Sequence, residues 1–567
     1  MTSEQQPGFV RRYIFSTDHK VVGIQYGITA AAFLLIGFSL VLLMRWQLAY
    51  PDDPVPGLGW VNEENVFLGD GFITPDFYNS LGVMHGTIMV FLAVVPLLVG
   101  AFGNYFVPLQ IGAKDMAFPR LNMLSYWVYL AGGLVILSTF LLPGGAPNSG
   151  WTAYPPLSII ATHGQTIWLL GMALIINSSL LGSLNVIATV MQLRVPGMTF
   201  LRMPFFVWSQ FVAAFLLLLA FPPLEAAAVL QLSDRLLDTS FFLPSGLAIS
   251  NEPLEVSGGG SVLLWQHLFW FLGHPEVYVL VLPAMGIISE VITNNTRRPL
   301  WGYRGMVASG TFLGFCSCIV WAHHMFLTGM GTTMSSIFEI TTITVSVPSL
   351  VILTSLVATL WGGSIRFTIP MLFALAYLPM FGIGGFTGIP LAFATSDIHL
   401  HDTYYVIGHF HYVIAPGTLF AIFAGVYHWF PRFTGKKMND VLGHLHFWPS
   451  LIFMNGIFFS MLIQGMADVS RRLYDGGEIY AHAQDVLYLN EVMSISAFGL
   501  AIAQTFFVLN LIWTLVKGEK SESSNPWEAT TLEWATASDL SVHRSPYEYS
   551  VPGATQDFTP QYQAEVT

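Results

Sequence analysis

Apolar stretches long enough to cross a bilayer recur along nearly the whole chain, and they constrain its fold more than any other feature. A transmembrane helix needs about 20 predominantly apolar residues. In the hydrocarbon core the backbone must satisfy its own hydrogen bonds, so such stretches form helices. Twelve candidates are present: residues 21–45, 80–108, 123–144, 161–191, 203–230, 261–293, 305–328, 336–362, 368–394, 403–430, 445–466 and 489–516. The sequence therefore predicts an all-α membrane protein with twelve transmembrane helices.

The composition agrees with a bilayer environment and excludes several classes of function. Of all residues, 54% are hydrophobic and only 10% are charged, whereas soluble proteins carry about 25% charged residues. The net charge of −12 and the lack of a basic patch exclude a nucleic-acid partner. Acidic outer loops instead suit a basic protein partner. No Cys-x-x-Cys-His motif is present, so no haem is covalently attached to this chain.

The distribution of positive charge orients the predicted helices, because cytoplasmic loops carry an excess of Lys and Arg. A cytoplasmic N-terminus leaves only four of the 21 Lys and Arg residues outside, namely Arg45, Arg235, Arg471 and Arg472. We therefore expect a cytoplasmic N-terminal segment (1–20), a twelve-helix domain (21–517) and a cytoplasmic, weakly folded C-terminal tail (518–567). The tails and overall length favour a bacterial inner membrane.

The stretch from His399 to Val413 concentrates ionisable side chains at the mouth of a predicted helix. Such side chains are costly within a membrane and usually mark a functional site. His409 and His411 are two residues apart, which is about 200° on a helix, so their rings point to opposite sides. One helix can then hold one cofactor on each face. His401 and Asp402 lie slightly earlier, where a hard cation fits.

Four further histidines are expected to meet this pair in the outer half of the membrane. His323 and His324 are about 100° apart on one helix, so both face one neighbour. His274 is the expected third ligand of a trigonal copper site, since imidazole suits copper and haem iron. Tyr278 lies four residues later on the same face. With His85, His409 and His411, six histidines are expected to converge.

Glu276, two residues after His274, points elsewhere. A carboxyl group buried there favours its protonated form, which suits a proton carrier.

Several of these runs resemble subunit I of the haem–copper terminal oxidases, the aa3-type, A-family cytochrome c oxidases. The resemblance extends from Ser16–Lys20 to Leu532–Trp534. The runs that carry it are Met84-His85-Gly86, Phe102-Gly103-Asn104, Asp115–Arg120, His274–Tyr278, His323-His324 and His401–His411. It implies that the twelve helices enclose two haems, expected to be haem a and haem a3, and one copper, CuB.

The resemblance also implies roles for individual residues. His85 and His411 are the axial ligands of the low-spin haem, and His409 is the proximal ligand of the high-spin haem. His274, His323 and His324 hold the copper, and Tyr278 is the tyrosine covalently linked to the first copper histidine. His401 and Asp402 bind magnesium at the subunit boundary. The residues expected at the haem propionates and substituents are Arg471, Arg472, Arg45 and Trp151. For Arg45, an interfacial snorkelling arginine is an equal alternative.

A proton path is implied as well, from Asp115 at the cytoplasmic side towards Glu276. The polar residues that match the family's route are Asn104, Asn122, Asn185, Ser178 and Ser179. Each alone is also compatible with a helix-packing role.

The sequence departs from the family pattern at a second proton route. Ile352 occupies the place of that route's lysine, and isoleucine cannot carry a proton. Glu290 replaces a usual histidine, Glu339 is unusual, and Met123 replaces an asparagine beside the first route. Either the second route works differently, or all protons use the Asp115 route, or the chemistry has changed.

The function implied is reduction of O2 to water, coupled to proton translocation. Electrons come from cytochrome c or a cupredoxin through a partner subunit, and subunits II and III are the expected partners. A divergent nitric oxide reductase is the first alternative: Ile352 and Glu339 favour it, and Tyr278 opposes it. A quinol oxidase is the second, although Phe77 and Ser80 stand where quinol-binding polar residues are expected. A transporter without haem is the third.

Overall fold

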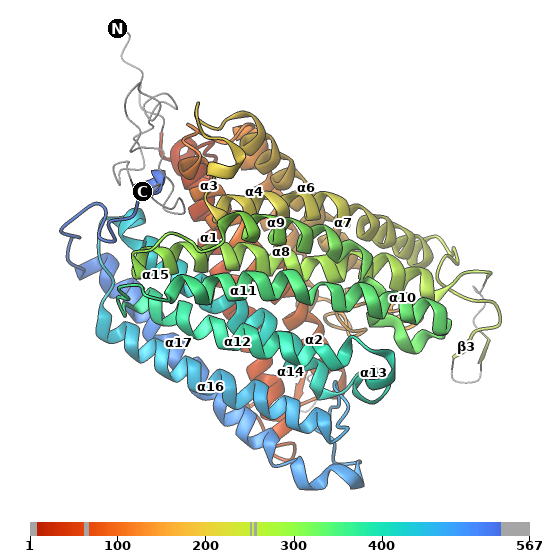
Figure 1. Ribbon diagram of the computed structural model, residues 1–567. Coiled ribbons are helices and arrows are strands. Elements are labelled where there is room, and N and C mark those ends of the chain that lie inside the picture. Colours follow the sequence, from red (N-terminus) through yellow and green to blue (C-terminus); the bar gives the residue numbers. More distant parts are fainter. Residues whose placement is uncertain (1–7, 62–66, 250–251, 254–257, 535–567) are drawn as a thin grey trace.

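The computed structural model describes residues 8–61, 67–249, 252–253 and 258–534, and within them it contains twelve helical spans long and apolar enough to cross a membrane. The predicted all-α membrane fold is therefore confirmed. Figure 1 shows the long helices lying alongside one another in one bundle. Two short antiparallel hairpins, β1 (Leu68–Gly69) with β2 (Phe72–Ile73) and β3 (Ala248–Ile249) with β4 (Glu252–Pro253), lie in the loops.

Seven of the spans are single helices, and five are built from consecutive helical pieces. The single helices are α1 (His19–Ala49), α6 (His163–Gln192), α7 (Phe205–Leu236), α8 (Val262–Thr296), α12 (Ile369–Leu391), α16 (Asp440–Met466) and α17 (Leu489–Lys517). The composite spans are α2 (Pro75–Thr87) with η2 (Ile88–Val94), η3 (Pro96–Gly103) and α3 (Asn104–Gln110); α4 (Pro119–Ser138) with η4 (Thr139–Leu141); α9 (Tyr303–Cys316) with η6 (Ser317–Ile319) and η7 (Trp321–Thr328); α10 (Gly331–Thr344) with α11 (Ser346–Leu360); and α14 (Tyr404–Ile414) with η8 (Ala415–Leu419) and α15 (Phe420–Thr434). The short α13 (Ala394–Leu400) follows α12.

Helix α8 forms the centre of the bundle. It contacts α7, α9, α12 and α15, and nearly all of its residues from His274 onwards are buried. Helices α4 and α6 pack on one flank, and α16 and α17 on the opposite flank (Figure 1). A helix surrounded by protein on all sides gives its polar side chains a place away from lipid, so α8 is well placed to carry a functional site.

Four spans begin about one turn earlier than their apolar stretches predict, at Pro75, Pro119, Gly331 and Asp440, and in two of them a capping side chain gives the reason. The second span begins at Pro75 instead of residue 80, because Thr74 caps it by accepting a hydrogen bond from the Phe77 amide at 3.4 Å. The eleventh begins at Asp440 instead of 445, where Asn439 accepts from the Leu442 amide at 3.0 Å. Hydropathy locates the bilayer-spanning part of a helix, whereas the capping residue determines where the helix starts.

The C-terminal tail is not weakly folded up to Trp534, so that part of the prediction is wrong. Trp527, Leu532, Glu533 and Trp534 are buried. The Glu533 carboxylate accepts from Gln110 Nε2 at 3.0 Å, and burial raises the pKa of this carboxyl. The buried tryptophans, together with the Glu533 oxygen that accepts from Gln110 and Trp429, fix the segment to the bundle end. Residues 535–567, the rest of the predicted tail, lie outside the described residues.

Candidate metal centre

Three imidazoles from two separate spans converge on one point. His274 lies on α8, and His323 and His324 lie on η7. Nε2 of His324 is 3.1 Å from Nε2 of His323 and 3.4 Å from Nδ1 of His274. One ring nitrogen of each residue lies within 4.8 Å of the other two. Three imidazole nitrogens around one point suit copper, so the arrangement agrees with the predicted copper site.

Each of these rings is held by a further contact. The Tyr278 hydroxyl lies 3.2 Å from the other ring nitrogen of His274, as expected for residues four apart on a helix. The Thr342 hydroxyl lies 2.9 Å from His323 Nδ1. The Trp270 ring stacks on His324 with centroids 3.8 Å apart. Such contacts orient ligands before a metal binds. Thr342 and Trp270 were not singled out from the sequence, although Trp270 lies four residues before His274.

The segment that carries His323 and His324 is a 3-10 helix and not the predicted α-helix. Its three residues per turn separate neighbouring side chains by about 120° instead of 100°. Both rings nevertheless face His274, so the convergence does not depend on the helix type.

His409 and His411 do point to opposite sides of α14. His409 Nδ1 lies 2.9 Å from the Gly384 carbonyl of α12 and 3.2 Å from the Thr387 hydroxyl. The His411 ring stacks on Phe458 of α16, with centroids 4.9 Å apart. A Cβ at Gly388 would lie 2.7 Å from His409 Cε1, so only glycine admits that ring.

The three predicted iron ligands share one hydrogen-bonding pattern. Nδ1 lies 2.8 Å from the Gly37 carbonyl in His85 and 2.9 Å from the Ile407 carbonyl in His411, and His409 does the same with Gly384. A carbonyl only accepts, so the proton resides on Nδ1 and the Nε2 lone pair is available to a metal. These residues therefore fit axial haem ligation.

Comparison with known proteins identifies the family. The profile described as cytochrome c and quinol oxidase polypeptide I matches residues 21–502. The chain belongs to this family. It is subunit I of a haem–copper oxidase, the catalytic subunit of a respiratory terminal oxidase, and an oxidoreductase.

Relatives match this oxidase over almost its whole length. An alternative cytochrome c oxidase subunit 1 from Bradyrhizobium diazoefficiens is 42% identical, over 98% of this chain and 94% of its own. A cytochrome c oxidase subunit 1 from Synechocystis is 42% identical, over 93% of this chain and 89% of its own length. A haem–copper terminal oxidase dimer solved by cryo-electron microscopy is 20% identical, with a TM-score of 0.73 over 95% of this chain and 88% of that chain. Because the identity is only 20%, this similarity shows a shared fold and nothing more.

The residues predicted for magnesium and the haem propionates lie together in two loops of the oxidase, one before α14 and one after α16. Arg471 Nε donates to the Asp402 carboxylate at 2.7 Å, and His401 Nδ1 lies 3.1 Å from Asp397. Burial alone would raise the pKa of Asp402, but Arg471 and His401 hold it below its usual value. Burial, followed by the charge of Arg471, lowers the pKa of Arg472 to about 10. His401 and Asp402 supply two ligand groups, so Mg²⁺ would take its other ligands elsewhere.

Arg45 and Trp151, which are also predicted to lie at the haems, are both held by contacts with neighbouring helices. Arg45 is only 3% exposed and donates from Nε to the Ser494 hydroxyl at 3.2 Å, so the alternative of a snorkelling arginine is wrong. The Trp151 indole packs over Gly86, next to His85. Its ring centroid also lies 6.4 Å from that of Trp270, which stacks on His324. Trp151 thus lies between the neighbourhood of His85, the predicted ligand of the low-spin haem, and Trp270, which stacks on the predicted copper ligand His324.

Some of the predicted proton-path residues form side-chain hydrogen bonds within the protein, and others have buried polar atoms without a hydrogen-bond partner in the described part of the chain. Asn185 brackets the backbone of Phe118, at 2.9 Å to its amide and 3.1 Å to its carbonyl, and so holds the loop that carries Asp115. Ser178 donates to the Ser125 carbonyl at 2.6 Å. Ser179 is half-buried on the same helix.

Unsatisfied atoms lie on Asn104, Asn122 and Glu276. Among the described residues, no partner is found for Oδ1 of Asn104, for either side-chain atom of Asn122, or for either carboxylate oxygen of Glu276, which is 4% exposed. Buried polar atoms are normally hydrogen-bonded, to protein or to water. These three residues therefore suit a path that carries water.

The unusual residues also have defined places. Ile352 is fully buried in the apolar core, and Glu290 is fully buried on α8. Glu339 on α10 accepts a hydrogen bond from the Ala394 amide at 2.8 Å and so caps α13. It links α10, which carries Thr342, to the helix that leads into His401.

Replacing Glu339 by alanine should loosen α13. Loss of a cap costs about 1 kcal/mol, so amide hydrogens of Ala394–Leu400 should exchange roughly fivefold faster by mass spectrometry. Glu339→Gln keeps the acceptor and should exchange like the wild type. Unchanged exchange in the alanine variant would show that the cap is dispensable.

Proposed function

We propose that this chain reduces O2 to water with electrons from cytochrome c or a cupredoxin, delivered through a partner subunit, and couples the reaction to proton translocation. The observation that carries the proposal is the triad of His274, His323 and His324 with Tyr278 beside it. The haems and copper, when bound, supply oxygen binding and electron transfer. One O2, four electrons and four protons give two molecules of water.

The residues at this centre have distinct tasks. His274, His323 and His324 would hold the copper, His409 the high-spin haem, and His85 with His411 the low-spin haem. The Tyr278 hydroxyl, 3.2 Å from His274 Nε2, is placed to give a proton and an electron at the copper side. Trp270 and Thr342 keep two of the ligand rings in position.

Protons would enter at Asp115 and travel past Asn122 and Asn104 to Glu276. The unsatisfied side-chain atoms of Asn122, Asn104 and Glu276 are the expected partners of ordered water. Ser125 and Tyr26 extend the path: the Tyr26 hydroxyl lies 3.1 Å from Ser125 Oγ.

Asp115→Asn should lower O2 consumption and proton uptake by on the order of 100-fold, because asparagine cannot exchange a proton at the entrance. The rates are measured with oxygen and pH electrodes on purified oxidase in vesicles. Asp485→Asn, at an exposed aspartate, is the control and should keep both rates. An Asp115→Asn oxidase with wild-type rates would contradict the path.

Nitric oxide reduction is the weaker alternative. Glu339 was one reason for considering it, and its carboxylate caps α13, which gives it a structural task. Purified oxidase should consume O2 at an oxygen electrode and should not consume NO above the rate without enzyme. The opposite result would establish the reductase.

The two residues at the positions expected to contact a quinol also favour cytochrome c as the electron donor, because both side chains are engaged within the protein. Phe77 packs on Phe67 with centroids 5.0 Å apart, and Ser80 donates to the Ala146 carbonyl at 3.0 Å.

The same proposal covers the remaining cofactors and partners. The haems would be haem a and haem a3, with Mg²⁺ at His401 and Asp402 and with subunits II and III as partners. The orientation would place both termini in the cytoplasm of a bacterium. A pyridine haemochrome spectrum and metal analysis test the cofactors.

A further inference from the structure

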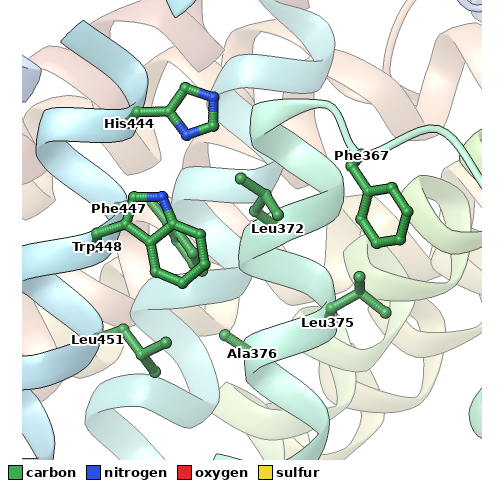
Figure 2. Close-up of a pocket in the computed structure, with 8 residues that line it drawn as sticks. All are labelled: Phe367, Leu372, Leu375, Ala376, His444, Phe447, Trp448 and Leu451. Atoms are coloured by element: carbon green, nitrogen blue, oxygen red, sulfur yellow. The ribbon is translucent and has the colours of Figure 1, made fainter. Parts of the chain in front are cut away.

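An apolar groove runs between α12 and α16 on the surface of the bundle. It has a volume of about 570 Å³, and its lining residues are Phe367, Leu372, Leu375, Ala376, His444, Phe447, Trp448 and Leu451. Figure 2 shows Leu372 and Ala376 of α12 facing the side chains of α16. Ala376 and Phe447 are buried, and Phe367 and Trp448 are exposed at the rims. The groove is therefore a preformed apolar channel that opens towards lipid.

A polar hollow continues the groove at the helix starts. Its volume is about 220 Å³, and it shares Phe367 and His444 with the groove. Lys437 and Asp440 line it, with Nζ and Oδ2 2.8 Å apart and with 57% and 60% of their side chains exposed. At 1.5 Å per residue, the lining of α16 from His444 to Leu451 extends about 10 Å. One leaflet of hydrocarbon is about 15 Å deep, so the groove covers about two thirds of one acyl chain, and the hollow lies where its headgroup would be.

We propose that this groove binds one phosphatidylethanolamine molecule, with an acyl chain between α12 and α16 and the headgroup over Lys437 and Asp440. The headgroup carries a phosphate and a primary ammonium. The phosphate accepts from Lys437 and the ammonium donates to Asp440, so the two charges of the protein exchange partners without leaving one unpaired. An anionic headgroup would face Asp440 with like charge, and a choline ammonium has no hydrogen to donate.

The proposal does not depend on the proposed reaction. If the proposed orientation is correct, the lipid belongs to the cytoplasmic leaflet.

Native mass spectrometry of the complete oxidase tests the site. The delipidated complex is mixed with phosphatidylethanolamine, phosphatidylcholine or phosphatidylglycerol, and bound lipid is counted. One phosphatidylethanolamine should be retained in preference to the other two. Ala376→Phe fills the groove and should weaken retention roughly tenfold, whereas Ile452→Phe, at an exposed position of α16 outside the lining, should not. Asp440→Asn should remove the preference over phosphatidylcholine.

Unchanged haem spectra and O2 consumption establish that the variants are folded. Equal binding of the three lipids, equal retention by Ala376→Phe, or no retained lipid because a partner subunit covers the groove would each overturn the proposal.

Discussion

Replacing Glu276 by glutamine is expected to reduce O2 consumption by at least about 100-fold, the effect of losing an essential proton carrier. Glu276 is 4% exposed, and neither of its carboxylate oxygens has a hydrogen-bond partner among the described residues. It lies two residues after His274, at the centre of the bundle. Glutamine has nearly the same shape and polarity but no exchangeable acid proton, so the loss should come from proton transfer and not from misfolding.

Oxygen consumption and proton release are measured in vesicles, together with the visible spectrum, which should not change. Glu225→Gln is the matched control, since Glu225 lies on α7 and accepts from Asn177 Nδ2 at 3.1 Å. Its activity should stay within about twofold of wild type. Glu276→Asp keeps an acid at the site and should recover part of the rate. Wild-type turnover and proton release in Glu276→Gln would exclude Glu276 from the path.

Replacing His323 by asparagine should remove copper and abolish O2 reduction. His323 supplies one of three imidazoles whose ligand atoms lie within 4.8 Å of one another, and two remaining imidazoles bind the ion far more weakly. Turnover should fall by at least about 100-fold, since the bound metal provides the reaction site. The low-spin haem spectrum should remain, because His85 and His411 lie on other elements, α2 and α14.

The copper-to-iron ratio of the purified oxidase gives a readout independent of activity. His267→Asn is the control: this histidine also lies on α8, but it accepts from Trp321 Nε1 at 3.2 Å and is outside the triad. It should retain copper and turnover. A His323→Asn oxidase with a full complement of copper would show that the triad is not the copper site.

Helical periodicity made part of the centre predictable from sequence. His409 and His411 fall on opposite faces of α14, and Tyr278 reaches His274 across one turn. Both relations involve residues at most four apart, and the fixed geometry of a helix determines them. The outcome for the tail was different. Its polar composition predicted weak folding, yet a few widely spaced residues, among them Trp527 and Trp534, bury enough surface to dock the described part of the tail, up to Trp534.

The sequence alone determined that the chain crosses a membrane as twelve helices, because burial of apolar side chains and backbone hydrogen bonding leave a long apolar stretch no other stable form in lipid. It also determined that His409 and His411 occupy opposite sides of one helix. Only the tertiary structure decided that η7 meets α8, that Thr342 and Trp270 hold the ligand rings, and that Glu339 caps α13. These contacts join separate elements, and they depend on how whole helices pack against one another, which no local pattern encodes.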